Sequence, residues 1–142
     1  LGAVLAGSPA DVEDACATYG QALGTAFQII DDVLDYDGDA TELGKNLGDD
    51  LREGKATLPL IIAMQRASAS DAALVRQAIE NGSTDQLETI ANIVRQTGAL
   101  VAAREAAASE ARRAIAALGA LPANEYSANL LQLAAQLLDR RT

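Results

Sequence analysis

The decapeptide FQIIDDVLDY, residues 27–36, places three aspartates in a run that is otherwise almost wholly apolar. An ionised carboxylate that is buried without a partner is strongly disfavoured, so such groups pair, bind a cation or shift their pKa. This stretch therefore raises the question of what neutralises Asp31, Asp32 and Asp35.

The decapeptide ends a predicted long helix over residues 9–36, in which Ser8 suits the N-cap and Pro9 the first turn. At about 100° per residue, one sector of this helix carries a polar stripe. The stripe consists of Gln28, Asp31, Asp32 and Asp35. Gly20 and Gly24 lie near the same side, and each costs about 1 kcal/mol relative to Ala.

A solvated acidic face explains this stripe poorly. The acids lie at the negative end of the helix dipole, and Asp31 and Asp35 are like charges one turn apart. A solvated face would also have no use for the two glycines. Acids in this electrostatic setting are typical of a divalent-cation site. Because only oxygen ligands are on offer and the site is open, Mg²⁺ is the expected ion.

A calcium-binding loop is an alternative, since Asp35, Asp37 and Asp39 occupy alternate positions. The spacing disfavours it. Gly38 falls at the fourth loop position instead of the sixth, and Asn46 stands where such loops have glutamate.

Composition excludes several other classes of protein. The chain has 142 residues and a formal charge of −9, with no visible basic patch, so we expect no nucleic-acid partner. It has no His, which excludes His-based catalysis and His-ligated zinc within this chain. Cys16 is the single cysteine, so a reducing cytoplasm is the expected location. The chain begins with Leu1, and LGAVLAG resembles the end of a helix, so we expect residues upstream.

The remaining pattern predicts an all-α fold of antiparallel helices with short connections. Residues 37–50 are polar, contain three glycines and are expected to form a loop. Thr57 is expected to cap a helix carrying LIIAM, and Ser70 another that Gly82 stops. Further helices are predicted at 84–96, 98–118 and 124–140.

Lys45 and Lys55 are the only lysines, and each follows a glycine. They could be ordinary surface lysines. Beside a metal-binding helix, however, a loop that carries lysine could close over a metal-bound polyphosphate and neutralise its charge.

These residues resemble a known family. FQIIDDVLDY is similar to the second aspartate-rich motif of the trans-polyprenyl diphosphate synthases, F-Q-x-x-D-D-x-x-D. The similarity continues through LGKNLGDDLREGKATLPLI and covers essentially the whole chain, with long-chain bacterial enzymes of the octaprenyl type most alike. The resemblance implies that residues 1–142 are the C-terminal helical portion of a single synthase domain whose N-terminal half is missing.

The resemblance also implies a function. The family's helical bundle surrounds a deep cavity, is commonly a homodimer, and joins isopentenyl diphosphate to an allylic diphosphate by Mg²⁺-assisted ionisation, condensation and proton loss. Carried over, Asp31 and Asp35 would hold Mg²⁺ with Asp32 supporting them as a third metal-binding residue. The implied catalytic set is Asp31, Asp32, Asp35 and Lys45. The implied substrate-binding set is Phe27, Gln28, Lys45 and Lys55.

The chain departs from the family pattern, because the first aspartate-rich motif and the arginine pair after it are absent. We therefore expect that this chain alone does not turn over. A class I terpene cyclase fragment, a non-catalytic regulatory subunit and a helical interaction module remain as alternatives.

Overall fold

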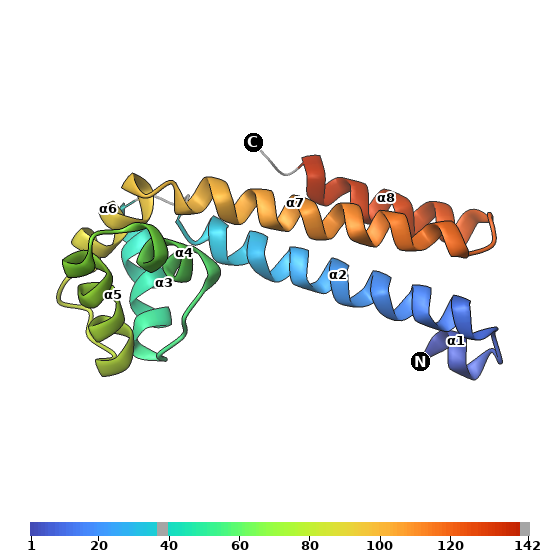
Figure 1. The fold of residues 1–142 in the computed structure, drawn as a ribbon, viewed down its shortest axis with the longest axis horizontal. Coiled ribbons are helices and arrows are strands. Elements are labelled where there is room, and N and C mark those ends of the chain that lie inside the picture. Colours follow the sequence, from blue (N-terminus) through green and yellow to red (C-terminus); the bar gives the residue numbers. More distant parts are fainter. Residues whose placement is uncertain (37–39, 140–142) are drawn as a thin grey trace. The chain divides into compact units, whose positions relative to one another are not determined.

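The computed structural model describes residues 1–36 and 40–139, with the side chains of 40–45, 138 and 139 left aside. Every regular element in this part of the chain is helical, which confirms the predicted all-α class (Figure 1). The elements follow in the order α1 (Gly2–Leu5), α2 (Ala10–Leu34), α3 (Ala40–Arg52), α4 (Leu58–Arg66), α5 (Ala69–Asn81), α6 (Leu87–Gln96), α7 (Ala99–Ala117), the 3₁₀ turn η1 (Leu118–Ala120) and α8 (Glu125–Asp139).

The chain divides into two compact units, and the assignment of residues 1–142 to a single synthase domain stays a prediction. The first unit contains residues Leu1–Gln28 and Ala106–Thr142, and the second contains Ile29–Glu105. Both α2 and α7 cross the boundary, so each contributes residues to both units.

The first unit packs small side chains between helices. Its buried alanines lie on α2, α7 and α8 and include Ala22, Ala26, Ala111, Ala114 and Ala134. Alanine allows neighbouring helices to approach closely with few voids. The Tyr19 hydroxyl donates to the Leu130 carbonyl at 2.8 Å, which ties α2 to α8, and burial raises the pKa of Tyr19.

The second unit has a core of larger side chains, which α3, α4, α5 and α6 contribute. Its fully buried members include Leu47, Leu51, Leu60, Val75, Ile90 and Val94. Each such side chain contributes about 1.5–3 kcal/mol on burial. This core holds the elements that surround the C-terminal end of α2.

The loop predicted over residues 37–50 is wrong for residues 40–50, which belong to α3. Leucines recur every fourth residue at 43, 47 and 51, which is a helical spacing. Leu47 and Leu51 are 1% and 0% exposed. Their burial outweighs the cost of about 1 kcal/mol for each glycine inside the helix. Residues 37–39, including Asp37, lie outside the described part.

The predicted helix ends are partly correct. Gly82 stops α5 in the left-handed conformation, as predicted, with φ 63°. Ser68 caps α5 instead of Ser70, and its hydroxyl accepts from the Asp71 amide at 3.2 Å. Thr57 stands at the N-cap of α4, but its side chain makes no capping hydrogen bond.

Candidate functional site

The three aspartates of the motif differ in burial, although all three fall within a five-residue segment at the end of α2 and in the turn that follows. Asp31 is exposed, Asp35 is half-buried, and Asp32 is only 6% exposed. Two consecutive residues therefore have opposite surroundings, because successive helical positions point about 100° apart. The exposed and half-buried carboxylates are accessible to a ligand, whereas Asp32 faces the protein.

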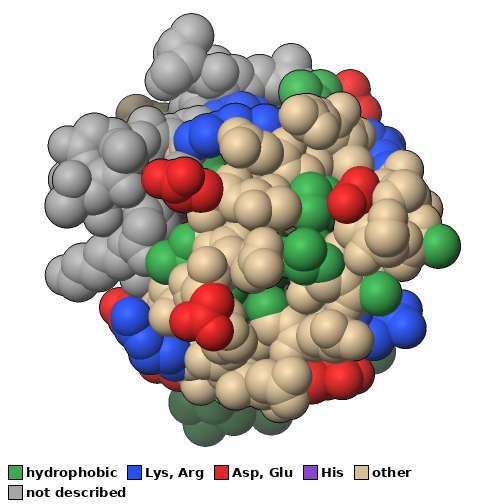
Figure 2. Space-filling model, turned by 90° about the vertical axis from the view of Figure 1, so that its left-hand side faces the viewer, with side chains coloured by type: hydrophobic (Ala, Val, Ile, Leu, Met, Phe, Trp, Pro, Cys, Tyr) green, Lys and Arg blue, Asp and Glu red, His purple; other side chains and the backbone are tan. Residues whose placement is uncertain are grey.

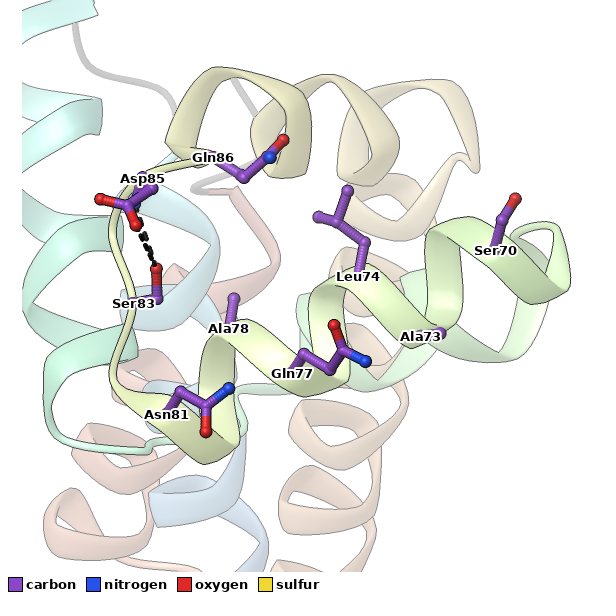
Figure 3. A pocket seen from close by; sticks show the side chains of 9 residues that line it. All are labelled: Ser70, Ala73, Leu74, Gln77, Ala78, Asn81, Ser83, Asp85 and Gln86. Atoms are coloured by element: carbon purple, nitrogen blue, oxygen red, sulfur yellow. Dashed lines mark hydrogen bonds between the residues drawn. The ribbon is translucent and has the colours of Figure 1, made fainter.

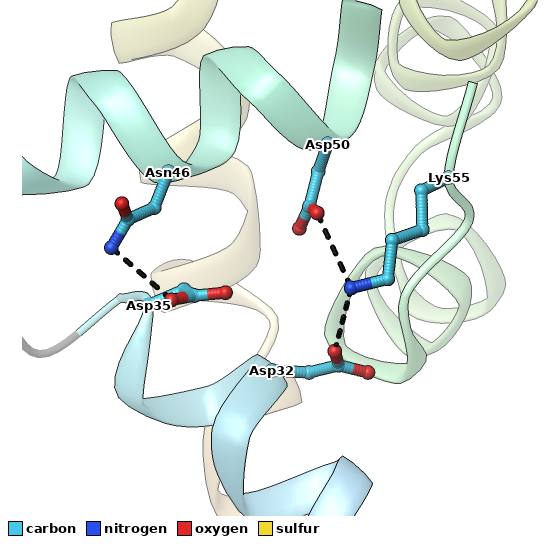
Figure 4. A network of polar contacts seen from close by, with 5 residues as sticks. All are labelled: Asp32, Asp35, Asn46, Asp50 and Lys55. Carbon is cyan, nitrogen blue, oxygen red and sulfur yellow. Dashed lines mark hydrogen bonds and ion pairs between the residues drawn. The ribbon is translucent and has the colours of Figure 1, made fainter. Parts of the chain in front are cut away.

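Asp32 is paired with Lys55 (Figure 4). The Lys55 ammonium lies 3.1 Å from Asp32 Oδ1 and 3.4 Å from Asp50 Oδ1. The side chains of Asp32 and Asp50 are 8% and 10% exposed, and that of Lys55 is 43% exposed. One ammonium therefore bridges two carboxylates that come from different helices, and it balances the charge of one of them.

The end of α3 brings Lys55 to this position. The Gly54 amide donates to the Leu51 carbonyl at 3.0 Å, and the Lys55 amide donates to the Asp50 carbonyl at 2.8 Å. These two bonds form a Schellman motif, which requires a left-handed residue after the helix. Gly54 supplies it with φ 66°. The backbone turn thus places Lys55 directly beside Asp50.

Asp35 is held by α3. The Asn46 side-chain amide donates to Asp35 Oδ1 at 3.1 Å. Burial raises the pKa of Asp35, the Lys55 ammonium lowers it, and the carboxylates of Asp32 and Asp31 raise it further. The net upward direction comes mainly from burial, which disfavours the charged carboxylate, and the neighbouring carboxylates add to it.

Asp50 and Lys55, which form an ion pair, also have shifted pKa values. Burial raises the pKa of Asp50 against the lowering effect of Lys55. The hydrogen bond to Asp32 raises the pKa of Lys55, which keeps its ammonium charged. Lys55 is therefore positively charged at neutral pH. For Asp50, burial disfavours the charged carboxylate.

Polar atoms without a hydrogen bond lie close to this network. They are Tyr36 Oη, Thr57 Oγ1 and Asp50 Oδ2, which are buried and make no hydrogen bond of standard geometry to the described residues. Burial raises the pKa of Tyr36, and the nearby Thr57 hydroxyl lowers it. Buried polar atoms of this kind indicate a site that has more polar groups than hydrogen-bond partners for them within the described residues.

The three aspartates do not converge on one point. Within the described ranges 1–36 and 40–139, no group of three or more Asp, Glu, Cys or His side chains is placed to hold a metal ion. Asp31 and Asp35 remain as two accessible carboxylates one turn apart, with oxygen donors only. This donor set fits Mg²⁺, which accepts one or two carboxylates and completes its shell with water and phosphate oxygens.

The other predicted residues lie in different surroundings. Phe27 packs against the first unit's core of Ala26, Ala111 and Leu137. Gln28 is exposed on α2. Lys45 belongs to α3, but its side chain lies outside the described part, so its predicted role stays a prediction.

Two residues of the network, Asn46 and Asp50, are missing from the predicted site. They lie one turn apart on α3 and contact Asp35 and Lys55 respectively. The leucine spacing of 43, 47 and 51 is the signal that could have found them, because it places Asn46 and Asp50 together on an adjoining helical face.

A separate polar pocket of about 370 Å³ lies between α5 and the segment before α6 (Figure 3). Amide, hydroxyl and carboxylate side chains line it, and the Ser83 hydroxyl donates to Asp85 at 3.2 Å. No residue of the aspartate motif lines this pocket. On the face shown in Figure 2, acidic and basic side chains are interspersed outside the grey residues, and Lys and Arg do not gather into one patch there.

Comparison with known proteins places the chain in a family. Residues 1–97 match the family model described as polyprenyl synthetase, and the chain belongs to this family. This confirms the resemblance seen in the sequence. None of the helices in the described residues combines the length and the apolar character that crossing a bilayer needs.

Among curated relatives, an all-trans-nonaprenyl-diphosphate synthase of Rhodobacter capsulatus is 46% identical over 138 residues. That match covers 97% of this chain and 42% of the relative. The octaprenyl diphosphate synthase of Escherichia coli is 46% identical over 132 residues, covering 92% of this chain and 41% of the relative. The chain therefore spans about two fifths of the length of these relatives.

Solved structures have the same fold. A polyprenyl synthase from Roseobacter denitrificans is 40% identical, with a TM-score of 0.84 over 98% of this chain and 46% of that one. A polyprenyl synthase from Caulobacter crescentus, complexed with calcium and isoprenyl diphosphate, is 41% identical. Its TM-score is 0.78 over 99% of this chain and 44% of that one.

Proposed function

We propose that this chain is the C-terminal part of a prenyltransferase that adds isopentenyl diphosphate to an allylic diphosphate. The observation that carries the proposal is the division of the motif on α2. Asp31 and Asp35 stay accessible one turn apart, while Asp32 is neutralised inside the protein by Lys55. Family membership and the diphosphate-synthase names of the relatives support this assignment over a terpene cyclase.

In this proposal Asp31 and Asp35 hold Mg²⁺ and Asp32 supports them from behind. When bound, Mg²⁺ would supply electrostatic stabilisation of the departing diphosphate. The calcium in the Caulobacter relative supports the use of a divalent cation by that protein and, we infer, by this one. The oxygen-only donor set favours Mg²⁺.

The remaining predicted residues act on the substrate. Lys45 contacts the diphosphate and adds positive charge where the leaving group accumulates negative charge. Lys55 has three donors and uses two of them on Asp32 and Asp50, so its third donor is available to assist. Gln28 and Phe27 are proposed to face the substrate. The longer protein is proposed to be a cytoplasmic homodimer.

Binding of magnesium and diphosphate tests the proposal. Isothermal titration of the protein with inorganic diphosphate in the presence of Mg²⁺ should give heat that Asp31→Ala abolishes. Asp14→Ala is the matched control, since Asp14 is an exposed aspartate of the same helix, and it should leave binding unchanged. Equal binding by both variants would overturn the assignment of the site. An unchanged melting temperature with and without ligand would instead favour a helical interaction module.

A further inference from the structure

Four carboxylates near the C-terminal end of α2 form two pairs that differ in how their charge is neutralised. Asp31 and Asp35 lie on one helix and its final turn, and are open to ligands. Asp32 and Asp50 come from α2 and α3, are at least nine-tenths buried, and meet at a single ammonium. The second pair thus already has a cation, which belongs to the chain itself.

The position of Lys55 between these carboxylates is built into the fold. Its backbone is fixed by the Schellman motif at Gly54, and its ammonium contacts one oxygen of each carboxylate (Figure 4). Without that ammonium, two buried like charges would face each other, which is a costly arrangement. Lys55 therefore stands where a bound cation would otherwise be needed.

We propose that Lys55 is a positioning residue that occupies the cation position between Asp32 and Asp50, so that Asp32 is withheld from the metal and Asp31 and Asp35 alone bind it. This inference rests on the proposed magnesium site. Asp50 serves in it as the second anchor of Lys55, and its carboxylate keeps the ammonium over Asp32. A lysine that only contacted diphosphate would have no need for two buried carboxylate partners.

Binding of Mn²⁺ without diphosphate tests the proposal, with free Mn²⁺ measured by electron paramagnetic resonance. Lys55→Met should bind Mn²⁺ more tightly, on the order of tenfold, because it removes the ammonium that neutralises Asp32 and so leaves more negative charge at this end of α2. This gain should disappear in the Asp32→Asn, Lys55→Met double variant. Lys55→Arg keeps the charge and should retain the affinity of the unchanged protein.

The matched control for the loss of one positive charge is Arg52→Met. Arg52 is an exposed residue of the same helix end and pairs with Asp49, away from Asp32. Arg52→Met should give no comparable gain in Mn²⁺ affinity. A gain that persists in the double variant, or that Arg52→Met reproduces, would show a general charge effect and overturn the proposal.

A second comparison does not depend on the folding of Lys55→Met. Asp31→Asn should weaken Mn²⁺ binding strongly, whereas Asp32→Asn should leave it within about twofold, because the loss of a ligand charge lowers the affinity more than the loss of a neighbouring charge. An equal loss of Mn²⁺ affinity in both variants would overturn the proposal that Asp32 is withheld from the metal.

If the unchanged protein binds no Mn²⁺, the proposed function fails. The Lys55–Asp32 coupling is then measured by a thermal double-mutant cycle, in which additive effects would overturn the pairing.

Discussion

At the scale of single residues, neighbouring acids of identical chemistry receive different roles from burial. Asp31 is exposed and Asp32 is 6% exposed, although they are consecutive. The charge of Asp32 is matched by Lys55 at 3.1 Å, whereas Asp31 lies open to solvent. The aspartate-rich stretch therefore combines an exposed carboxylate with a buried carboxylate that anchors Lys55.

Asp35 gives a pH-dependent prediction. Its pKa is raised in the folded protein, chiefly by burial, above the ordinary value of 3.8. Its contribution to stability is thus fully present below pH 3.8 and is lost as the pH rises through the raised pKa. In metal-free buffer, Asp35→Asn should melt at a higher temperature than the unchanged protein at pH 7, and the difference should close as the pH falls below 4.

Thermal unfolding followed by circular dichroism at a series of pH values measures this effect. The control is Asp14→Asn, which removes an exposed charge from the same helix. If the melting temperature of Asp35→Asn exceeded that of the unchanged protein by more at acid pH than at pH 7, the predicted pH dependence would be contradicted. Added Mg²⁺ should narrow the advantage of Asp35→Asn, because only the unchanged protein retains both proposed ligands.

At the scale of elements, the turn after α3 is the most constrained piece of backbone near the site. Gly54 adopts φ 66°, a conformation that costs about 1–2 kcal/mol for a residue with a Cβ. Gly54→Ala should therefore lower the free energy of unfolding by about 1–2 kcal/mol and disturb the Lys55–Asp50 contact. Urea denaturation of the purified chain measures this change in the free energy of unfolding.

Gly24→Ala is the control of opposite sign. Gly24 is a helical residue of α2, and a Cβ there would meet no atom within 4 Å. The substitution should stabilise the chain by about 0.5–1 kcal/mol because alanine loses less backbone entropy. Stabilisation by both substitutions would contradict the role assigned to the Gly54 turn.

The cap of α5 gives a third prediction. Ser68 accepts a hydrogen bond from the Asp71 amide, whereas Ser70 lies inside the helix. Ser68→Ala should cost about 1 kcal/mol of stability, as is typical of a lost N-cap. Ser70→Ala should cost clearly less in the same denaturation assay. An equal loss would mean that the two hydroxyls share the cap.

Comparison of α2 with α3 explains what sequence reasoning could predict. Helix α2 has a long amphipathic pattern and clear start signals, so its extent was predictable within a few residues. Helix α3 contains two glycines and many polar residues, and its formation depends on burying Leu47 and Leu51 in a core built by distant segments. Local propensity is a weak guide where such tertiary burial decides.

The same limit applies to the site. The aspartate motif and Lys55 were predictable from spacing and family resemblance. The pairing of Lys55 with Asp32 and Asp50 was not, because it depends on how the end of α3 turns back toward α2. Asn46 was missed for the same reason, since a predicted loop gives no register for its side chain.

At the scale of the whole molecule, the chain carries one acidic motif and a net charge of −9. An anionic diphosphate would be repelled by such a chain unless cations mediate the contact. The chain also spans only about two fifths of the length of its curated relatives. Its share of the proposed site is thus the C-terminal end of α2, where we propose that Asp31 and Asp35 bind Mg²⁺.

Activity gives the corresponding prediction. The 142-residue chain, supplied with allylic and isopentenyl diphosphates and Mg²⁺, should form no elongated product, because the first aspartate-rich motif is absent from its sequence. A longer protein that supplies that motif should elongate, and chelation of Mg²⁺ should abolish the reaction. Clear elongation by the 142-residue chain would contradict the proposed division of the site.

The most direct measurement is the position of the metal. Crystals grown with Mn²⁺ and diphosphate should show an anomalous scattering peak beside the carboxylates of Asp31 and Asp35, with Asp32 still paired to Lys55. A peak remote from Asp31 and Asp35, or these two carboxylates turned into solvent with the ligand bound elsewhere, would contradict the account.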